Sequence, residues 1–289
     1  MEIAIMDEME ENVVKEISKM GRVKYKPNHS ELTDAEFIIV RSATKVNAEL
    51  LDKAPKTKFV ARAGVGLDNV DQKECEKRGI KVYNTPNASS NAVAELSIGL
   101  IFSLLRNLPR ADKGTKEGKW EKKNLLGNEF SQKTLGVIGY GRIGSLLGQK
   151  ARALGAKVIA VSKETPPEGV EFCTLEELAK RSDIISIHAP LTNETKGMVN
   201  KELISKMKKN ALIINTSRGE IIDEKALFEA LREKRIAGAA LDVYCKEPYS
   251  GELSTLENVV LTPHIGASTN EAQNRIGEEL IKILRTLLN

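Results

Sequence analysis

The 289-residue chain has few of the residues that build disulfide frameworks and metal sites. It holds three cysteines, three histidines and one tryptophan, and aromatic residues make up only 4% of it. The cysteines, Cys75, Cys173 and Cys245, are odd in number and lack metal-ligand spacing, which favours reduced intracellular thiols over disulfides. The composition therefore predicts an intracellular protein without a metal site.

The chain also lacks a large excess of one charge and a long apolar run. Basic and acidic residues number 44 and 40, and the formal net charge is +4, so no face is marked for nucleic acid or an anionic membrane. The longest apolar stretch, residues 93–105, is short for a bilayer span and contains Glu95. The N-terminus lacks the basic region of a signal peptide. We expect a cytoplasmic protein with no nucleic-acid or membrane partner.

The chain does have a regular alternation of apolar runs and amphipathic segments. In the first part, runs at 2–6, 22–25, 37–40, 58–61 and 80–83 predict strands. A helix is expected from Ser89 or Ser90 to just before Pro109, and then a long polar connection over 110–133. The second part has apolar runs at 135–139, 157–161, 183–187, 211–216, 236–241 and 259–262.

The segment TLGVIGYGRIG, residues 134–144, is typical of a buried strand that runs through three glycines into a helix. Gly139 allows the tight turn, Gly141 lets the backbone approach a pyrophosphate, and Gly144 permits close packing of the following helix. The N–H groups that open this helix would point at the anion. The segment therefore predicts a dinucleotide site.

Together, these patterns predict an α/β protein with two doubly wound parallel-sheet domains. The six runs of the second part match the strand count of a complete Rossmann cofactor sheet. The last helix, residues 269–289, lies far past the final strand, and we expect it to return to the first lobe. The prediction is a flavodoxin-like substrate domain over 1–91 and 270–289, with a dinucleotide-binding domain inserted over 92–269.

Polar residues follow the later strands of the second part, where open α/β sheets bind ligands. They are Arg218, Asp242, Glu247 and His264. Taken singly, a loop arginine is usually a solvated charge, a lone histidine is more often structural, and Asp242 could cap a turn. Beside a nucleotide fingerprint they fit hydride transfer to a carbonyl, with a histidine as proton donor, a carboxylate to hold it and an arginine for a substrate carboxylate.

Several long motifs, in order along essentially the whole chain, resemble the D-isomer-specific 2-hydroxyacid dehydrogenase family. They are VRSATKV (40–46), RAGVGLDNVD (62–71), NTPNASSNAVAEL (84–96), GKWEKK (118–123), GYGRIG (139–144), NTSRGEIIDEKAL (215–227), AGAALDVY (237–244), KEP (246–248) and PHIGASTNEAQ (263–273). The resemblance implies that Arg218 binds the substrate carboxylate and carbonyl, that His264 is the acid/base and that Glu247 supports the histidine.

The resemblance also implies the groups that meet the cofactor. Asp242 would contact the nicotinamide side, and Val65 and Gly66 would offer backbone to substrate or cofactor. The full cofactor set expected is Val65, Gly139, Gly141, Arg142, Ile143, Gly144, Ser162, Lys163, His188, Ala189, Pro190, Thr216, Ser217, Asp242, Gly266 and Ala267.

One motif bears on the substrate. In the branch of this family that acts on 3-phosphoglycerate, the RSATKV segment lines the substrate pocket, so by resemblance Arg41 and Lys45 would meet a phosphate. A dianionic phosphate needs charge-assisted donors, although Arg41 could simply end a strand. The substrate set expected is Arg41, Lys45, Val65, Gly66, Arg218 and His264.

The sequence departs from the family pattern in two places. The strand at 157–161 should be followed by an acid that binds the adenosine ribose of NAD, but Ser162 and Lys163 stand there. Without the acid, nothing repels a 2′-phosphate, so NAD and NADP both stay open as cofactors. The chain also stops at Asn289, where many relatives continue into a domain that senses serine, and we expect no feedback through such a domain.

The function expected is oxidation of 3-phosphoglycerate to 3-phosphohydroxypyruvate, at the entry to serine synthesis. The alternative within the family is reduction of glyoxylate or hydroxypyruvate, which needs no phosphate site. A dinucleotide-sensing binding protein would have no need of Glu247 and His264, and a nucleoside-linked hydrolase would need a longer substrate domain. The resemblance also implies a homodimer.

Overall fold

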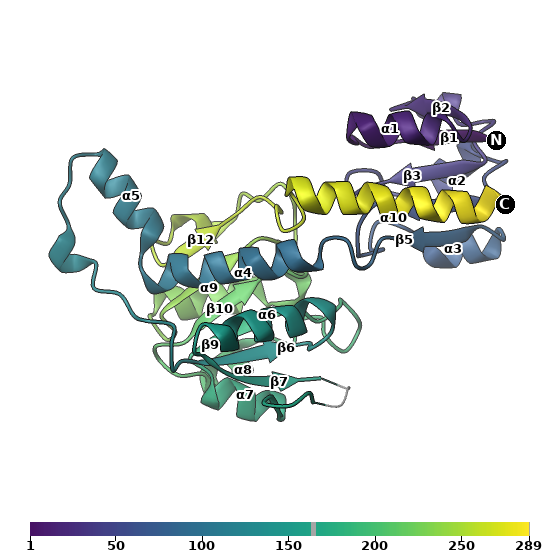
Figure 1. Cartoon of the computed structure of the whole chain (residues 1–289). Helices are drawn as coiled ribbons and strands as arrows, with labels where there is room; N and C mark the ends of the chain where they lie inside the picture. The colour runs from purple at the N-terminus through teal and green to yellow at the C-terminus, as the bar shows by residue number, and fades with distance from the viewer. Residues whose placement is uncertain (163–165, 289) are drawn as a thin grey trace. The chain divides into compact units, whose positions relative to one another are not determined.

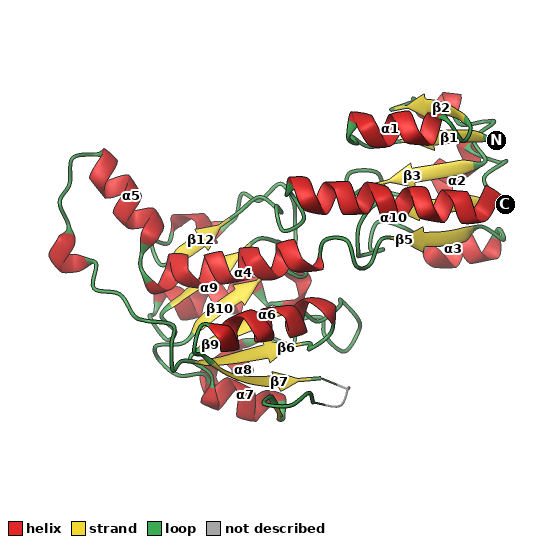
Figure 2. Ribbon diagram, viewed as in Figure 1, coloured by secondary structure: helices red, strands yellow, loops and turns green. Residues whose placement is uncertain are grey.

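The computed structural model describes residues 1–162 and 166–288, and the chain divides into two compact units (Figure 1). Unit 1 comprises Met1–Ser90 and Ala267–Asn289, and unit 2 comprises Asn91–Gly266. Each unit is a parallel sheet with helices packed on it (Figure 2). The predicted fold class, two parallel α/β sheets, is confirmed.

Unit 1 has five strands in the order β2-β1-β3-β4-β5, which is the flavodoxin-like order. The strands are β1 (Glu2–Ile5), β2 (Arg22–Tyr25), β3 (Phe37–Val40), β4 (Phe59–Arg62) and β5 (Lys81–Asn84). The helices are α1 (Glu11–Ser18), α2 (Ala48–Lys53), α3 (Gln72–Lys77) and α10 (Asn270–Leu288), with a 3-10 turn η1 (His29–Glu31).

The central strand β3 shows why this sheet needs helices on both faces. All four of its side chains are buried. Phe37 and Ile39 join a cluster with residues of α1 and α10, whereas Ile38 and Val40 join a cluster with residues of α2 and α3. A continuous apolar run is what a parallel strand covered on two sides requires. Since α10 supplies buried residues such as Leu280, the C-terminal helix belongs to the core of unit 1.

Unit 2 has seven strands in the order β12-β11-β10-β9-β6-β7-β8. They are β6 (Thr134–Ile138), β7 (Lys157–Val161), β8 (Glu171–Phe172), β9 (Ile184–Ile187), β10 (Leu212–Asn215), β11 (Gly238–Leu241) and β12 (Val259–Leu261). The helices are α4 (Ser90–Leu105), α5 (Leu108–Lys116), α6 (Arg142–Ala153), α7 (Leu175–Arg181), α8 (Lys201–Lys206) and α9 (Glu224–Arg232). Three 3-10 turns are η2 (Lys122–Asn124), η3 (Gly219–Ile221) and η4 (Glu252–Thr255).

The structure corrects two expectations about this unit. The segment expected as a polar connection begins with a helix, α5, whose second residue is Pro109. Proline loses no helical hydrogen bond in a first turn, so the residue that stops α4 also starts α5. The sheet also has a seventh strand, β8, which pairs with β7 and is too short for hydrophobic periodicity to indicate.

Apolar side chains of α4 are buried in the core of unit 2, where Ile101 and Leu105 join a cluster with residues of β6 and α6. Among the described residues, no single helix is long and apolar enough to cross a bilayer. Only α4 and α5 taken together reach that length and composition, with a bend of 64° between them. Cys75, Cys173 and Cys245 are free thiols.

The strand order of unit 2 creates a topological switch point between β6 and β9. From β6 the chain moves outward to β7 and β8, and then it returns to β9 and moves outward on the other side. All of these pairings are parallel, so the carboxyl ends of the strands lie on one edge. Open α/β sheets bind ligands at this edge, beside the switch point. We call it the ligand edge of unit 2.

Candidate active site

The glycine loop joins β6 to α6 at the switch point. Gly139 has φ +90°, and a Cβ there would lie 2.6 Å from the backbone nitrogen of Ala189. A Cβ on Gly144 would lie 2.2 Å from the carbonyl oxygen of Gly139. The protein itself therefore requires glycine at these two positions, first for the turn beside the β9 loop and then for close packing of α6 on the glycine loop.

Gly141 differs because a Cβ there would meet no described protein atom within 4 Å. It is the N-cap of α6 and has φ −78°, which any residue can adopt. Neither packing nor backbone geometry explains a glycine here, whereas a bound anion approached closely by the backbone would. Arg142 and Ile143 open the helix at this point. The residues of this loop therefore fit a dinucleotide cofactor.

The loop after β9 carries His188, Ala189 and Pro190 beside the glycine loop. The Nε2 atom of His188 lies 2.8 Å from Oγ of Ser186, and its Nδ1 atom is buried without a hydrogen-bond partner among the described residues. Burial lowers the pKa of His188 to about 3, so the ring is neutral at pH 7. A buried ring nitrogen without a partner calls for a water or a ligand, which fits a cofactor contact in this loop.

Two hydrogen bonds tie the loop after β10 to its surroundings. Oγ1 of Thr216 lies 3.1 Å from Oγ of Ser97, a buried residue of α4. Because the Ser97 hydroxyl already donates to the carbonyl of Val93, Thr216 is the donor in this contact. The Ser217 hydroxyl donates to the carbonyl of Ala189 at 2.9 Å, which joins the loops after β9 and β10.

Glu247 and His264 form a hydrogen-bonded pair at the ligand edge of unit 2. Nδ1 of His264 lies 2.8 Å from Oε2 of Glu247, and both side chains are about 40% exposed (41% and 38%). The other carboxylate oxygen accepts the backbone N–H of Tyr244 at 3.2 Å, which fixes the carboxylate. An ionised carboxylate only accepts hydrogen bonds, so Nδ1 of His264 is the donor in this contact and Nε2 is the ring nitrogen left to act on a substrate.

Asp242 binds a side chain that precedes His264 and the backbone that follows it. Its buried carboxylate accepts hydrogen bonds from the Thr262 hydroxyl at 2.7 Å and from the N–H groups of Ile265 and Gly266, each at 2.8 Å. His264 has φ +54°, a left-handed conformation that costs a non-glycine residue about 1–3 kcal/mol. The three hydrogen bonds to Asp242 stabilise this conformation, so Asp242 positions the histidine. Its contact with the nicotinamide stays a prediction.

Arg218 follows β10 and precedes η3. Its Nη1 atom donates to the carbonyl of Ser217 at 2.6 Å, and its own carbonyl accepts from the side-chain amide of Asn215 at 2.9 Å. A Cβ on the next residue, Gly219, would lie 2.0 Å from the carbonyl carbon of Tyr244. The backbone beside Arg218 therefore packs directly on the segment that leads to Glu247, and only glycine fits between them.

In unit 1 the predicted substrate residues follow β3 and β4, at the carboxyl ends of the strands. Arg41 and Lys45 share the loop after β3, where Nη1 of Arg41 donates to the carbonyl of Glu8 at 3.0 Å and Lys45 is exposed. Val65 and Gly66 lie in the loop after β4, where the carbonyl of Val65 accepts from the side-chain amide of Asn84 at 2.6 Å. Both loops therefore lie on the edge of the sheet where α/β proteins bind ligands.

The remaining predicted cofactor residues have different outcomes. Ser162 directly follows β7 and is half-buried, whereas Lys163 lies outside the described residues. Gly266 is buried, with its N–H on Asp242. Ala267 belongs to unit 1, where its carbonyl accepts from the side-chain amide of Gln273 at 2.7 Å.

Sequence reasoning missed residues that hold the loops without carrying chemistry, among them Asp7, Asn69 and Ser97. Asp7 follows the apolar run at 2–6, much as Asp242 follows the run at 236–241, so an acid directly after a predicted strand is a usable signal. Ser97 lies within an apolar helix and gives no such signal.

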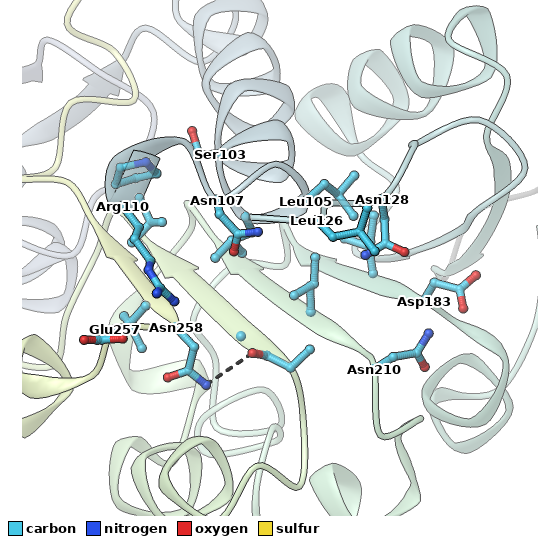
Figure 3. A pocket seen from close by; sticks show the side chains of 18 of the residues that line it. Ser103, Leu105, Asn107, Arg110, Leu126, Asn128, Asp183, Asn210, Glu257 and Asn258 are labelled. Carbon is cyan, nitrogen blue, oxygen red and sulfur yellow. Dashed lines mark hydrogen bonds between the residues drawn. The ribbon is translucent and has the colours of Figure 1, made fainter. Parts of the chain in front are cut away.

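A cavity of about 260 Å³ lies at the opposite edge of unit 2 (Figure 3). Its lining includes Asp183, Asn210 and Asn258, which precede β9, β10 and β12, and the side-chain amide of Asn258 donates to the carbonyl of Ala237. None of the predicted site residues lines it. A cavity at the amino ends of the strands is on the wrong edge for the nucleotide.

Residues 98–266 match the sequence model of the D-isomer specific 2-hydroxyacid dehydrogenase family, NAD binding domain. The chain belongs to this family. The predicted family, oxidoreductase class and nicotinamide cofactor are thereby confirmed, and the matched residues include the glycine loop and the Glu247–His264 pair.

Named relatives show how varied the substrates of similar proteins are. A hydroxypyruvate reductase of Thermotoga maritima is 47% identical over 263 residues, which cover 89% of this chain and 86% of that protein. A D-3-phosphoglycerate dehydrogenase of Methanocaldococcus jannaschii is 43% identical over 300 residues, which cover 98% of this chain and 57% of that protein. A solved acyclic imino acid reductase in complex with NADPH and D-Arg has a TM-score of 0.92 and 32% identity, over 100% of this chain and 97% of that one.

The 2-hydroxyacid dehydrogenase relatives also differ in length. The chain spans 86% of the Thermotoga reductase but only about half, 48% to 57%, of the curated phosphoglycerate dehydrogenases that it matches. Family membership therefore fixes the reaction class, hydride transfer with a nicotinamide cofactor, and leaves the substrate to be argued from the site.

Proposed function

We propose that this enzyme oxidises 3-phosphoglycerate to 3-phosphohydroxypyruvate with NAD or NADP. The observation that carries the proposal is the 2.8 Å contact between Nδ1 of His264 and Oε2 of Glu247, on the edge of unit 2 that also carries the glycine loop. A histidine held by a carboxylate, on the same sheet edge as a dinucleotide loop, fits oxidation of an alcohol. Such a site can remove the proton from the hydroxyl oxygen and the hydride from the carbon that carries it.

The roles of the residues follow from their hydrogen bonds. A nicotinamide cofactor held by the glycine loop would supply the acceptor for the hydride of substrate C2. His264 takes the proton of the C2 hydroxyl at Nε2, because Nδ1 already donates to Glu247. The carboxylate of Glu247 stabilises the imidazolium that forms. The guanidinium of Arg218 binds the substrate carboxylate and polarises the C2 oxygen as the carbonyl forms.

A phosphorylated substrate is supported by the loop after β3 in unit 1. Arg41 and Lys45 place two cations four residues apart in this one loop. A phosphate dianion is recognised by such charge-assisted donors, arginine above all. The phosphoglycerate dehydrogenases among the relatives point to the same substrate.

Reduction of hydroxypyruvate or glyoxylate is the second candidate, and the 47% identity to a hydroxypyruvate reductase favours it. This reaction would run through the same Arg218, Glu247 and His264. It would give Arg41 no phosphate to bind, so the two candidates differ in one residue that can be changed.

A dinucleotide-sensing binding protein is the candidate from another functional class. Such a protein has no use for a general base, so the hydrogen-bonded Glu247–His264 pair argues against it. A nucleoside-linked hydrolase is likewise disfavoured by membership of a family of dehydrogenases.

We further propose a cytoplasmic homodimer. Trp120 and Leu126 lie between α5 and β6 and are 83% and 91% exposed. Figure 1 shows α5 and this segment reaching away from the sheet of unit 2. Large apolar side chains this exposed favour burial against a second copy of the chain, which sedimentation equilibrium of the parent and of Trp120→Ala would test.

A substrate and cofactor panel tests the proposed reaction. The purified enzyme would be assayed with 3-phosphoglycerate, and in reverse with 3-phosphohydroxypyruvate, hydroxypyruvate and glyoxylate, each with both nicotinamide cofactors. We expect the highest kcat/KM with the phosphorylated pair. A clear preference for hydroxypyruvate would replace the first candidate with the second.

Two variants separate the chemistry from the substrate. His264→Ala should lower kcat by about 10²–10⁴-fold, the usual size of a lost acid/base, while NADH still binds. Near-normal turnover would refute its role. Arg41→Ala should raise KM for 3-phosphohydroxypyruvate and leave hydroxypyruvate unaffected, whereas equal effects on both substrates would argue against a phosphate site.

A further inference from the structure

A buried carboxylate that the chemistry above does not use lies under the loop of Arg41. Asp7 follows β1 and is 8% exposed. One of its oxygens, Oδ2, accepts the backbone N–H of Arg41 at 2.5 Å and that of Thr44 at 3.3 Å. The other, Oδ1, accepts the Thr44 hydroxyl at 2.5 Å. All three donors belong to the segment 41–44.

The same segment is held from its other side by Asn69. Its side-chain amide donates to the carbonyl of Arg41 at 2.8 Å and to that of Thr44 at 2.6 Å. The backbone N–H groups of Arg41 and Thr44 and the Thr44 hydroxyl therefore donate to Asp7, whereas the carbonyls of both residues accept from Asn69. The loop is fixed at both of its ends, and the tip formed by Ser42 and Ala43 is exposed.

We infer that Asp7 is a positioning residue for recognition of a phosphate monoester by the loop of Arg41. This inference rests on the proposed function, because it takes Arg41 to be the phosphate ligand. By fixing the backbone at Arg41 and Thr44, Asp7 reduces the conformational freedom that the loop would lose on binding phosphate. Unit 2 contains a similar arrangement. Asp242 directly follows β11, and it accepts three hydrogen bonds from the loop of His264, which follows the neighbouring strand β12.

The sign of the effect separates positioning from simple electrostatics. A carboxylate close to a bound phosphate repels it, so on charge alone Asp7→Asn would tighten phosphate binding and lower KM. If Asp7 positions the loop, the same substitution raises KM. The reason is that the neutral amide oxygen of asparagine accepts the two backbone N–H groups without charge assistance, and the NH₂ group that replaces the second oxygen cannot accept the Thr44 hydroxyl.

The experiment measures KM and kcat in the reductive direction with 3-phosphohydroxypyruvate and with hydroxypyruvate, which differ in the phosphate. For Asp7→Asn we expect KM for the phosphorylated substrate to rise about tenfold, equivalent to about 1.4 kcal/mol. The kcat values and KM for hydroxypyruvate should stay within about twofold, because the role proposed for the loop is to bind the phosphate and not the reacting C2 group. Thr44→Val removes one of the three donors and should show the same selectivity with a smaller rise.

Glu8→Gln is the matched control, because the exposed Glu8 side chain lies next to Asp7 in sequence and makes no hydrogen bond to the loop. It measures the effect of removing one negative charge nearby, and we expect KM for the phosphorylated substrate to stay the same or fall. A fall or no change in Asp7→Asn as well would overturn the inference. Equal losses with both substrates would assign Asp7 a purely structural role and overturn it too.

Two further outcomes keep this test separate from that of the proposed function. If Asp7→Asn does not fold, Thr44→Val decides, and an unchanged KM for 3-phosphohydroxypyruvate in that variant overturns the inference. Arg41→Ala tests the phosphate site by itself. Selective loss in Arg41→Ala with parental behaviour of Asp7→Asn refutes only the positioning role, whereas no selectivity in Arg41→Ala refutes the phosphate site on which that role depends.

Discussion

Replacing Gly141 with alanine separates a glycine required by a ligand from glycines required by the protein. A methyl group at this position meets no described atom within 4 Å, and φ of −78° suits alanine. The folded apo-protein should therefore accept the change. Alanine is a poorer N-cap than glycine by up to about 1 kcal/mol, which lowers Tm by no more than about 2–4 °C in a domain of this size.

The cofactor should respond much more strongly than the fold. If the pyrophosphate lies against Gly141, the new methyl group displaces it from the N–H groups that open α6. Losing one charge-assisted hydrogen bond costs about 1.5–3 kcal/mol, which raises Kd for NADH or NADPH by about 10- to 150-fold. Fluorescence titration of the reduced cofactor measures Kd, and differential scanning calorimetry of the apo-protein measures Tm.

Gly144→Ala is the matched control with the opposite expectation. Its Cβ would lie 2.2 Å from the backbone oxygen of Gly139, so the backbone itself must move. Overpacking that moves backbone costs about 2–3 kcal/mol, the upper part of the usual range, and the better helix propensity of alanine returns about 1 kcal/mol at most. The net loss of about 1–2 kcal/mol should lower Tm by about 2–8 °C. An unchanged Kd in Gly141→Ala would refute a pyrophosphate at this loop, and an unchanged Tm in Gly144→Ala would refute the packing argument.

Three further predictions concern His264, the cofactor and pH. Asp242→Asn should lower kcat by about 100-fold, equivalent to about 2.7 kcal/mol, because the left-handed backbone of His264 relaxes and the ring loses its position. The control, Asp223→Asn at the N-cap of α9, should leave kcat unchanged. A lower Tm without a lower kcat in Asp242→Asn would contradict this prediction. Ser162→Asp should raise the NADPH/NADH ratio of KM values about tenfold by repelling a 2′-phosphate, and an unchanged ratio would show that position 162 does not meet the ribose. The pKa of His188, lowered to about 3 by burial, lies below the value of about 6.5 expected in the unfolded chain. The unfolded state therefore binds more protons between these pH values, and the free energy of unfolding falls by about 2 kcal/mol between pH 7 and pH 5 on this account. In His188→Gln, urea titrations at pH 7 and pH 5 should show a smaller change in the free energy of unfolding than in the parent protein. The same change in both proteins would refute a buried, neutral His188.

Local pattern was enough to predict most of the fold. The apolar runs at 22–25 and 37–40 coincide with β2 and β3, and those at 58–61 and 80–83 lie one residue before β4 and β5. Buried parallel strands are short continuous apolar runs, so the pattern marks them directly. The two-residue β8 and the helix α5 escaped because one is too short for a period and the other lies in a polar, glycine-containing segment.

The candidate catalytic residues could also be proposed from the sequence, because each follows a predicted strand. Arg218, Glu247 and His264 stand out in the sequence as polar residues after apolar runs, and parallel strands bring their carboxyl ends to one edge. The residues that hold them were not readable in the same way. The place of Asp7 directly after an apolar run marks it as a candidate, but the partners of Asp7 and Ser97 lie 34 to 119 positions away, and no local pattern encodes them.

The sequence by itself therefore determined the fold class, the family, the cofactor class and the types of side chain available for catalysis. Only the tertiary structure decided which glycines the protein itself requires, because close approach of Gly144 to Gly139 and open space at Gly141 are distances. It alone joined His264 to Glu247 at 2.8 Å and placed the carboxylates of Asp242 and Asp7 under the loops of His264 and Arg41. Hydrogen bonds between distant segments depend on the packed backbone, whereas strands, turns and motifs depend on neighbours in the chain.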